Sequence, residues 1–156
     1  MRTAQQEQRR NYQNRPKPKP NFVDLNTDSQ SIVVSAPVSE VYHRCLRFEE
    51  FPAFITSIKK IKRIDDTRFS CASIINGKEV KSDVLIMMRI PDRRIAWQAV
   101  SDYFRVGVVF LDPLLRDATR VSVKVRSIIE PVMLTGALRH YLRNFKVYIE
   151  NDTKGK

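Results

Sequence analysis

Few side chains in this sequence are suited to catalysis. The histidines are His43 and His140, and the cysteines are Cys45 and Cys71. His43 and Cys45 are two positions apart in a segment with helical spacing, so they point to different sides of it. No His, Cys, Asp and Glu residues have metal-site spacing, and no G-x-S-x-G nucleophile elbow is present. We therefore assign no catalytic residue and expect neither a metal nor a cofactor.

The other polar candidates are hydroxyls. Ser73, Ser82 and Ser127 fall on the expected inward face of strands, but none has a convincing base partner. Chemistry through an enol would need groups that activate the enol and stabilise an oxyanion. His140 and Tyr141 are next to each other near the C-terminus. His140 is either solvated or close to a cavity mouth, and Tyr141 is either a core aromatic or a hydroxyl pointing into the cavity.

Two residues on expected strands have both a packing and a functional interpretation. Trp97, the single tryptophan, either packs in the core or forms a wall that stacks on a flat ligand. Cys71 is predicted to be a small buried side chain rather than a nucleophile.

The chain has 156 residues in all, a length that favours one domain. Its hydrophobic and charged shares, 42% and 29%, are ordinary for a globular protein. Two cysteines cannot form a disulfide scaffold, and no apolar run approaches a membrane span. We expect a cytoplasmic protein without a signal peptide.

The formal net charge is +11, and much of it lies at the N-terminus. Residues 1–21 carry six basic residues against Glu7, and the alternating prolines from Pro16 to Pro20 favour extended chain. We predict a disordered basic arm over 1–24, an ordered domain over 25–151 and a disordered tail over 152–156. The arm is a solubilising tail, or it contacts an acidic membrane surface, RNA or an acidic protein.

The ordered part begins with a strand and two helices. A strand is predicted over 29–35, and Pro37 then stands at a helix start. Val38, Val41, Tyr42, Cys45 and Phe48 form one apolar helix face. A second short helix follows from Glu49.

In the segments that follow, apolar and polar residues alternate with a period of two, as in strands, until a final helix begins. Strands are predicted around Ile58–Ile64, Phe69–Ile75, Glu79–Ile90, Ile95–Ala99, Val106–Leu111 and Thr119–Glu130. Asn76-Gly77 is a strong hairpin signal. Met133–Glu150 has a helical apolar stripe. This order predicts an α+β fold in which a curved antiparallel sheet of six to seven strands wraps round the C-terminal helix.

Several motifs resemble the polyketide cyclase/dehydrase family of the START-like (SRPBCC, helix-grip) superfamily, which includes the coenzyme Q-binding proteins. The similarity covers about residues 29–150 and is carried by Ala36–Tyr42, Phe48–Phe54, Asp65–Arg68, Asn76–Lys78, Ile90–Trp97, Gly107–Phe110 and Thr119–Val121. It implies a cavity between the sheet and the last helix that holds an apolar or amphipathic ligand. The candidate ligand-binding residues are Phe54, Cys71, Val84, Ile86, Met88, Trp97, Val123, Val125, Leu138, Tyr141 and Leu142.

The sequence departs from this family pattern in two places. The last helix, at 18 residues from Met133 to Glu150, is shorter than is common in the family. The face of the sheet that looks away from the cavity is also unusually apolar, because strand side chains alternate. Its candidate interface residues are Ile74, Leu85, Met87 and Phe110, and they suggest a homodimer or a protein partner on the convex face. Burial by the N-terminal segment, or a strand register other than the one assumed, is the alternative explanation.

Three functions are compatible with the sequence. We favour a non-catalytic carrier or sensor of a hydrophobic small molecule such as a lipid, quinone or polyketide-like compound. The first alternative is an RNA- or ribosome-associated module, because one branch of the family resembles ribosome-association toxins. The second is an aromatase/cyclase or dehydratase.

Overall fold

A seven-stranded antiparallel sheet and one long helix make up most of the molecule. The structure is a computed structural model that describes residues 25–75, 77–100 and 105–154. The predicted arm over 1–24 and Asn76 of the hairpin signal therefore lie outside the described residues. The elements are β1 (Asn26–Val34), α3 (Val38–Cys45), the 3-10 helix η1 (Phe48–Ala53), β2 (Ile58–Arg63), β3 (Arg68–Ile75), β4 (Lys78–Ile90), β5 (Arg94–Val100), β6 (Arg105–Leu114), β7 (Ala118–Ser127) and α4 (Pro131–Lys154).

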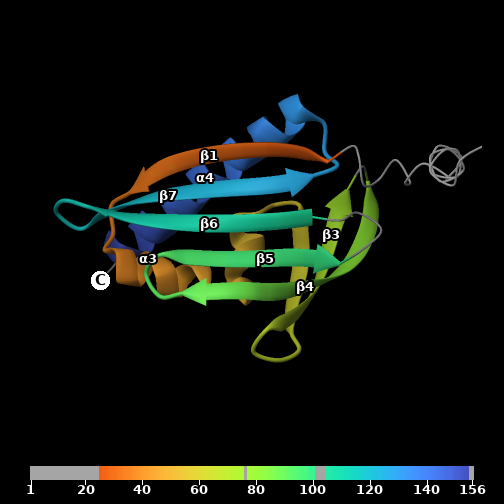
Figure 1. The fold of residues 1–156 in the computed structure, drawn as a ribbon, viewed down its shortest axis with the longest axis horizontal. Helices are drawn as coiled ribbons and strands as arrows, with labels where there is room; N and C mark the ends of the chain where they lie inside the picture. Colours follow the sequence, from red (N-terminus) through yellow and green to blue (C-terminus); the bar gives the residue numbers. More distant parts are fainter. Residues whose placement is uncertain (1–24, 76, 101–104, 155–156) are drawn as a thin grey trace, which may run out of the picture.

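The sheet has the strand order β1-β7-β6-β5-β4-β3-β2. From β2 to β7 each strand therefore pairs with the next one in the chain, and β1 joins at the β7 edge. Figure 1 shows the sheet across the front of the molecule, with α4 and the short helices behind it. This arrangement confirms the predicted α+β helix-grip fold, with two short helices after the first strand.

Alternating side chains give the sheet one buried and one exposed face. In β1 the alternation is regular and ends at Val34, which is fully buried. In β7, Val121 and Val125 are buried while Lys124 and Arg126 are exposed. Because the apolar side chains of each strand share one face of the sheet, that face must be covered by other elements. Helices α3 and α4 cover it.

Helix α4 is longer than the sequence analysis predicted. It runs from Pro131 to Lys154, 24 residues, rather than over the 18 residues from Met133 to Glu150. The shortened helix expected from the sequence is therefore wrong, and the helix continues into the tail predicted from residue 152. Beyond the apolar stripe, Asp152 forms an ion pair with buried Arg44 of α3, which holds the last turns against the domain.

Side chains of α4 also attach the helix to β1 at the edge of the sheet. Arg139 Nε donates to Gln30 Oε1 at 3.2 Å. Lys146 Nζ donates to the carbonyl oxygen of Val33 at 2.7 Å and to Glu150 Oε1 at 2.6 Å. Because these bonds lie along the β1 side, they fix α4 close to that edge of the sheet.

One irregularity in β4 changes which residues face inward. Ile86 pairs with Trp97 and Met88 pairs with Ala96, so two steps along β4 match one step along β5, and Met87 is the extra residue of a β-bulge. Met88 therefore lies on the outer face and is 41% exposed. Its assignment as a ligand-binding residue is wrong, because the period-two pattern was extended through the bulge.

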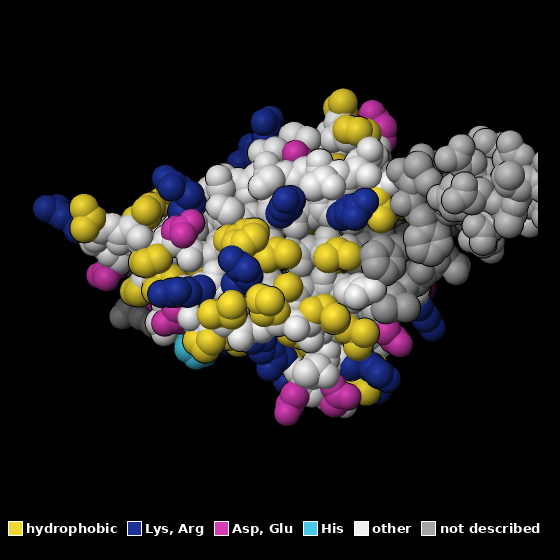
Figure 2. Space-filling view, in the orientation of Figure 1, with side chains coloured by type: hydrophobic (Ala, Val, Ile, Leu, Met, Phe, Trp, Pro, Cys, Tyr) yellow, Lys and Arg dark blue, Asp and Glu magenta, His cyan; other side chains and the backbone are white. Residues whose placement is uncertain are grey.

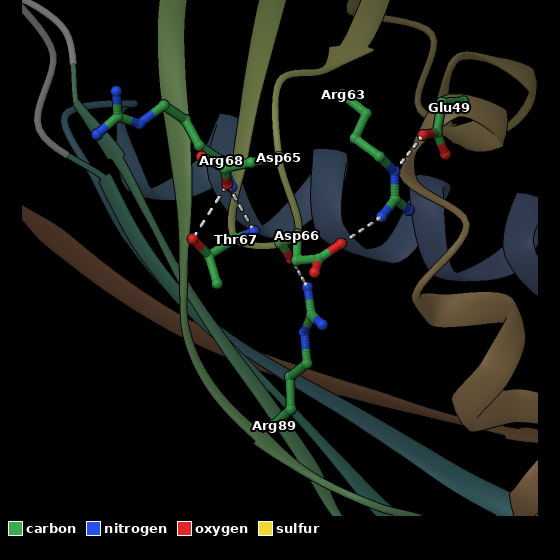
Figure 3. A network of polar contacts seen from close by, with 7 residues as sticks. All are labelled: Glu49, Arg63, Asp65, Asp66, Thr67, Arg68 and Arg89. Carbon is green, nitrogen blue, oxygen red and sulfur yellow. Dashed lines mark hydrogen bonds and ion pairs between the residues drawn. The ribbon is translucent and has the colours of Figure 1, made fainter.

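A polar network closes the turn between β2 and β3 (Figure 3). Asp65 Oδ1 accepts hydrogen bonds from the amides of Thr67 and Arg68, at 2.9 and 2.8 Å, and these bonds lower the pKa of Asp65. Arg63 Nε donates to Glu49 Oε1 at 3.0 Å and so joins η1 to β2. Arg89 of β4 donates to the carbonyl oxygen of Asp66. The network connects η1 with three consecutive strands.

Candidate ligand-binding site

The layer between the sheet and α4 is filled at one end by aromatic side chains. We call this region, where α3, η1 and the C-terminal half of α4 meet, the packed end. Phe145 lies 5.2 Å from Phe54 between ring centroids, Phe54 lies 5.1 Å from Phe51, and Phe51 lies 5.0 Å from Phe48. The buried members of its core cluster are Val34, Ala36, Val41, Tyr42, Cys45, Phe54, Ile95, Leu111, Val121, Leu142, Phe145 and Ile149.

Trp97 occupies the middle of the layer. It contacts the small cluster of Phe48, Phe69 and Ile86 as well as the cluster of Val125, Leu134 and Leu138. Its cross-strand neighbour on β6 is Gly107. A Cβ on that glycine would lie 2.2 Å from Trp97 Cζ2, so the indole lies across the glycine. A strand glycine often marks such a close approach, and this was the signal for Gly107 that the sequence analysis left unused.

Several inward-facing residues around Trp97 are only half-buried. Val84 pairs with buried Phe69, and Val123 lies between buried Val121 and Val125 on the same face, yet both keep accessible surface. Trp97 and Tyr141 do so as well. Protein interiors are otherwise packed as closely as organic crystals. We call the half-buried Val84, Trp97, Val123 and Tyr141, together with the buried Leu138 of α4, the Trp97 region.

The predicted ligand-binding residues divide between these two regions. Val84, Ile86, Trp97, Val125 and Leu138 belong to or pack on the clusters around Trp97, and Val123 packs both on one of these and on the core cluster of the packed end. Phe54 and Leu142 instead belong to the packed end, where protein side chains contact them. Cys71 is buried on the inner face next to Ser73, with Sγ and Oγ 3.5 Å apart.

A few polar groups lie beside the Trp97 region. The hydroxyl of Tyr141 donates to Ser57 Oγ at 3.0 Å, which joins α4 to the segment before β2. Asn144 Nδ2 donates to the carbonyl oxygen of Phe54 at 3.1 Å and lies 3.3 Å from His140 Nε2. Sequence reasoning missed Ser57 and Asn144, since only the fold brings them to α4. His140 is exposed.

Ionisable chemistry in the layer is sparse. Burial raises the pKa of the Cys45 thiol to about 12, so this cysteine stays protonated. Among residues 25–75, 77–100 and 105–154, no group of three or more His, Cys, Asp and Glu is placed to hold a metal ion. No helix of the described chain is long and apolar enough to cross a lipid bilayer. The described layer is therefore suited to apolar contact, with hydroxyl groups at its margin.

The four candidate interface residues do not form one patch. Leu85 and Phe110 lie on the outer face together with the bulge residue Met87, which is 60% exposed. Ile74 is also outward and exposed, but it pairs with Glu79. That pairing places it eight residues along β4 from Met87, roughly 26 Å away at strand spacing. Val106, Val108 and Ile90, which the sequence analysis did not name, join the outer face instead.

The sequence and the fold of this chain are both similar to those of known proteins. No family model matches the chain. Over 97 residues it is 33% identical to an uncharacterized 17.2 kDa protein of the melC2-rnhH intergenic region of Streptomyces lincolnensis. That match covers 62% of this chain and 65% of the relative, so it spans just under two-thirds of the relative's length.

The solved structures are more distant in sequence and similar in fold. A START superfamily protein from Mycobacterium smegmatis has a TM-score of 0.68 at 16% identity, and the match covers 80% of this chain and 97% of that protein. The Zhui aromatase/cyclase from Streptomyces sp. R1128 has a TM-score of 0.69 at 11% identity, covering 83% of this chain and 96% of that protein. The chain thus has the START-like helix-grip fold, which polyketide aromatase/cyclases share. This confirms the fold that the sequence resemblance implied.

Proposed function

We propose that this chain binds an apolar or amphipathic small molecule between the inner face of its sheet and α4, in the Trp97 region, and acts as a carrier or sensor. One observation supports this most strongly. Val84, Trp97 and Val123 lie on the inner face of the sheet, Trp97 and Val123 pack on Leu134 and Leu138 of α4, and all three side chains are only half-buried. A ligand that covers this surface gains roughly 25 cal/mol for each Å² of apolar area removed from water, before ordering costs.

The chemistry of the region favours hydrophobic recognition with little polar selection. Its side chains are valines, a leucine and the indole of Trp97, and its Tyr141 adds a hydroxyl that bonds to Ser57. Small-molecule sites combine apolar walls with a small number of polar groups in this way. A lipid, quinone or polyketide-like compound with one oxygen near Tyr141 fits this description.

The test uses Trp97 as an internal reporter, since it is the single tryptophan. The neutral probe N-phenyl-1-naphthylamine is titrated into the full-length protein, and energy transfer from Trp97 is measured. Val123→Phe should fill the accessible volume and weaken probe binding about tenfold or more, because the added ring takes the place of the ligand. Met87→Glu, on the outer face, serves as the control and should leave binding unchanged.

Two results would count against the proposal. One is unchanged probe binding in Val123→Phe while the variant unfolds like the wild type. The other is native mass spectrometry that shows neither a retained apolar molecule nor uptake of the probe.

Catalysis is the second candidate, favoured by the likeness to aromatase/cyclases and by the paired hydroxyls of Tyr141 and Ser57. Tyr141→Phe separates the two functions. In a carrier, this change alters affinity only modestly, because one hydroxyl is lost. In a cyclase, it abolishes turnover of a poly-β-ketone substrate while binding persists.

A further inference from the structure

We propose that the outer face of strands β4 to β7 is a docking surface for a protein partner with an acidic contact surface. Figure 2 shows hydrophobic side chains gathered on the face of the sheet toward the viewer, with Lys and Arg side chains among them. We call this surface, made of the outward residues of β4 to β7, the outer patch. Its apolar residues are Leu85, Met87, Met88, Ile90, Ala96, Val106, Val108 and Phe110.

The strand register places cations beside these apolar residues. Arg126 is the cross-strand neighbour of Val106, and Lys124 is the neighbour of Val108. Arg94 pairs with Phe110 on β6, and its guanidinium lies 4.8 Å from the centre of that ring. Lys124 and Arg126 are exposed, and within the described part of the chain neither forms an ion pair. A partner that covers this face must supply negative charge opposite them.

Charge argues against the two occupants that this chain itself could provide. Among the described residues of β4 to β7, the outward carboxylates are Glu79, Asp83 and Asp112, which lie toward the ends of the face. A second copy would bring its own Lys124 and Arg126 and only these three carboxylates, so it offers less negative charge than an acidic partner, and buried unpaired charges are costly. The N-terminal residues 1–21 carry six basic residues against one acidic residue, so they bring no net negative charge for Lys124 and Arg126.

The shape of the patch favours a protein over a membrane surface. Val106, Val108 and Ala96 are short, half-buried side chains on the neighbouring strands β5 and β6. Interfacial membrane helices bury their apolar face about 5–10 Å into the headgroup and acyl boundary. The short side chains of this sheet do not reach that depth, so only Met87, Met88 and Ile90 would insert. Met, Phe and Arg are enriched at protein interfaces, which combine an apolar centre with a polar rim.

The experiment places a photoreactive p-benzoylphenylalanine at Met87 of the full-length protein in cells that make it naturally. The control carries it at Val147, which is exposed on α4. The expected result is one protein that is captured from position 87 and not from 147, through a surface rich in Asp and Glu. The purified partner should bind about tenfold or more weakly to Lys124→Glu/Arg126→Glu, and exchanging a partner carboxylate for lysine should restore binding.

Each other outcome overturns the proposal. A cross-linked pair of this chain would show a second copy on the face. Co-sedimentation with vesicles of equal parts phosphatidylcholine and phosphatidylglycerol, lost in Lys124→Glu/Arg126→Glu, would show a membrane surface. Absence of a position-specific adduct, or a captured partner that binds the folded double variant as tightly as the wild type, would show that the patch does not dock an acidic protein.

Discussion

The layer under α4 is packed in two different ways along its length. At the packed end, Phe145, Phe54 and Phe51 contact one another as rings, and Val121 and Ile149 are almost fully buried. In the Trp97 region, residues of the same strands and the same face keep accessible surface. Val121 and Val123 are two residues apart on β7 and face the same way, yet Val121 is almost fully buried while Val123, which packs on clusters of both regions, is half-buried. The packed end therefore contributes most of the buried aromatic core, and the Trp97 region is where we propose that a ligand binds.

The largest effect is expected from opening the packed end. Phe145→Ala should lower the free energy of unfolding by about 3–5 kcal/mol, because it removes a buried ring and leaves a cavity. Urea denaturation measures this change. Val147→Ala, two residues further along α4 and exposed, is the control and should change stability by no more than about 0.5 kcal/mol. A loss below about 1 kcal/mol in Phe145→Ala would mean that the packed end does not dominate stability.

A smaller effect is expected where Trp97 crosses Gly107. Gly107→Ala should cost about 1–3 kcal/mol and shift the Trp97 emission, because the new Cβ takes the space of the indole. The double variant Gly107→Ala/Trp97→Leu removes the clash and should recover most of that loss. If the single variant kept both its stability and its emission spectrum, the indole would not lie over the glycine in solution.

The sequence predicted the order of elements because each carries its own pattern. Alternation in β7 and the helical stripe of α4 both follow from local periodicity, which is set by backbone geometry. The inward positions Val84, Ile86, Trp97 and Val125 follow from the same rule and are confirmed to lie on the inner face.

The remaining features depend on contacts between distant segments. The bulge at Met87 is an extra residue in one strand, so only the pairing with β5 reveals that Met88 faces outward. The last turns of α4 have a polar sequence, so no apolar stripe predicts them. They are held by the ion pair of Asp152 with Arg44 of α3, a residue remote along the chain. Half-burial of Val123 and close packing of Val121 differ because of what lies opposite each residue, and the β7 sequence does not contain that information.

The next prediction concerns how α4 is held to β1 under acid. The hydrogen bond from Lys146 lowers the pKa of Glu150, which also accepts a bond from the Ser35 amide at 2.9 Å. A carboxyl group with a lowered folded pKa stabilises the fold above its unfolded pKa and loses that contribution as the pH falls through the folded value. Glu150→Gln should therefore cost about 1 kcal/mol at neutral pH, with the difference from wild type vanishing in acid.

Urea denaturation of both proteins across this pH range provides the measurement. Lys146→Met should show the same acid dependence, because it removes the donor that lowers the Glu150 pKa. A constant difference between Glu150→Gln and wild type at every pH would mean that the charge of Glu150 does not contribute.

The smallest effect is expected at the surface network near η1. The pKa of Glu49 is lowered mainly by the hydrogen bond that Arg63 donates to it. Both side chains are 45% exposed, so water screens their interaction. Glu49→Gln should change the free energy of unfolding by no more than about 0.5 kcal/mol, and added salt should remove even that difference. Probe binding in the Trp97 region should be unaffected, because Phe48 and Phe51 hold η1 against β3 through their rings. A clear loss of probe affinity in Glu49→Gln would show instead that this exposed pair positions η1, and the boundary between the packed end and the Trp97 region would then depend on surface charge.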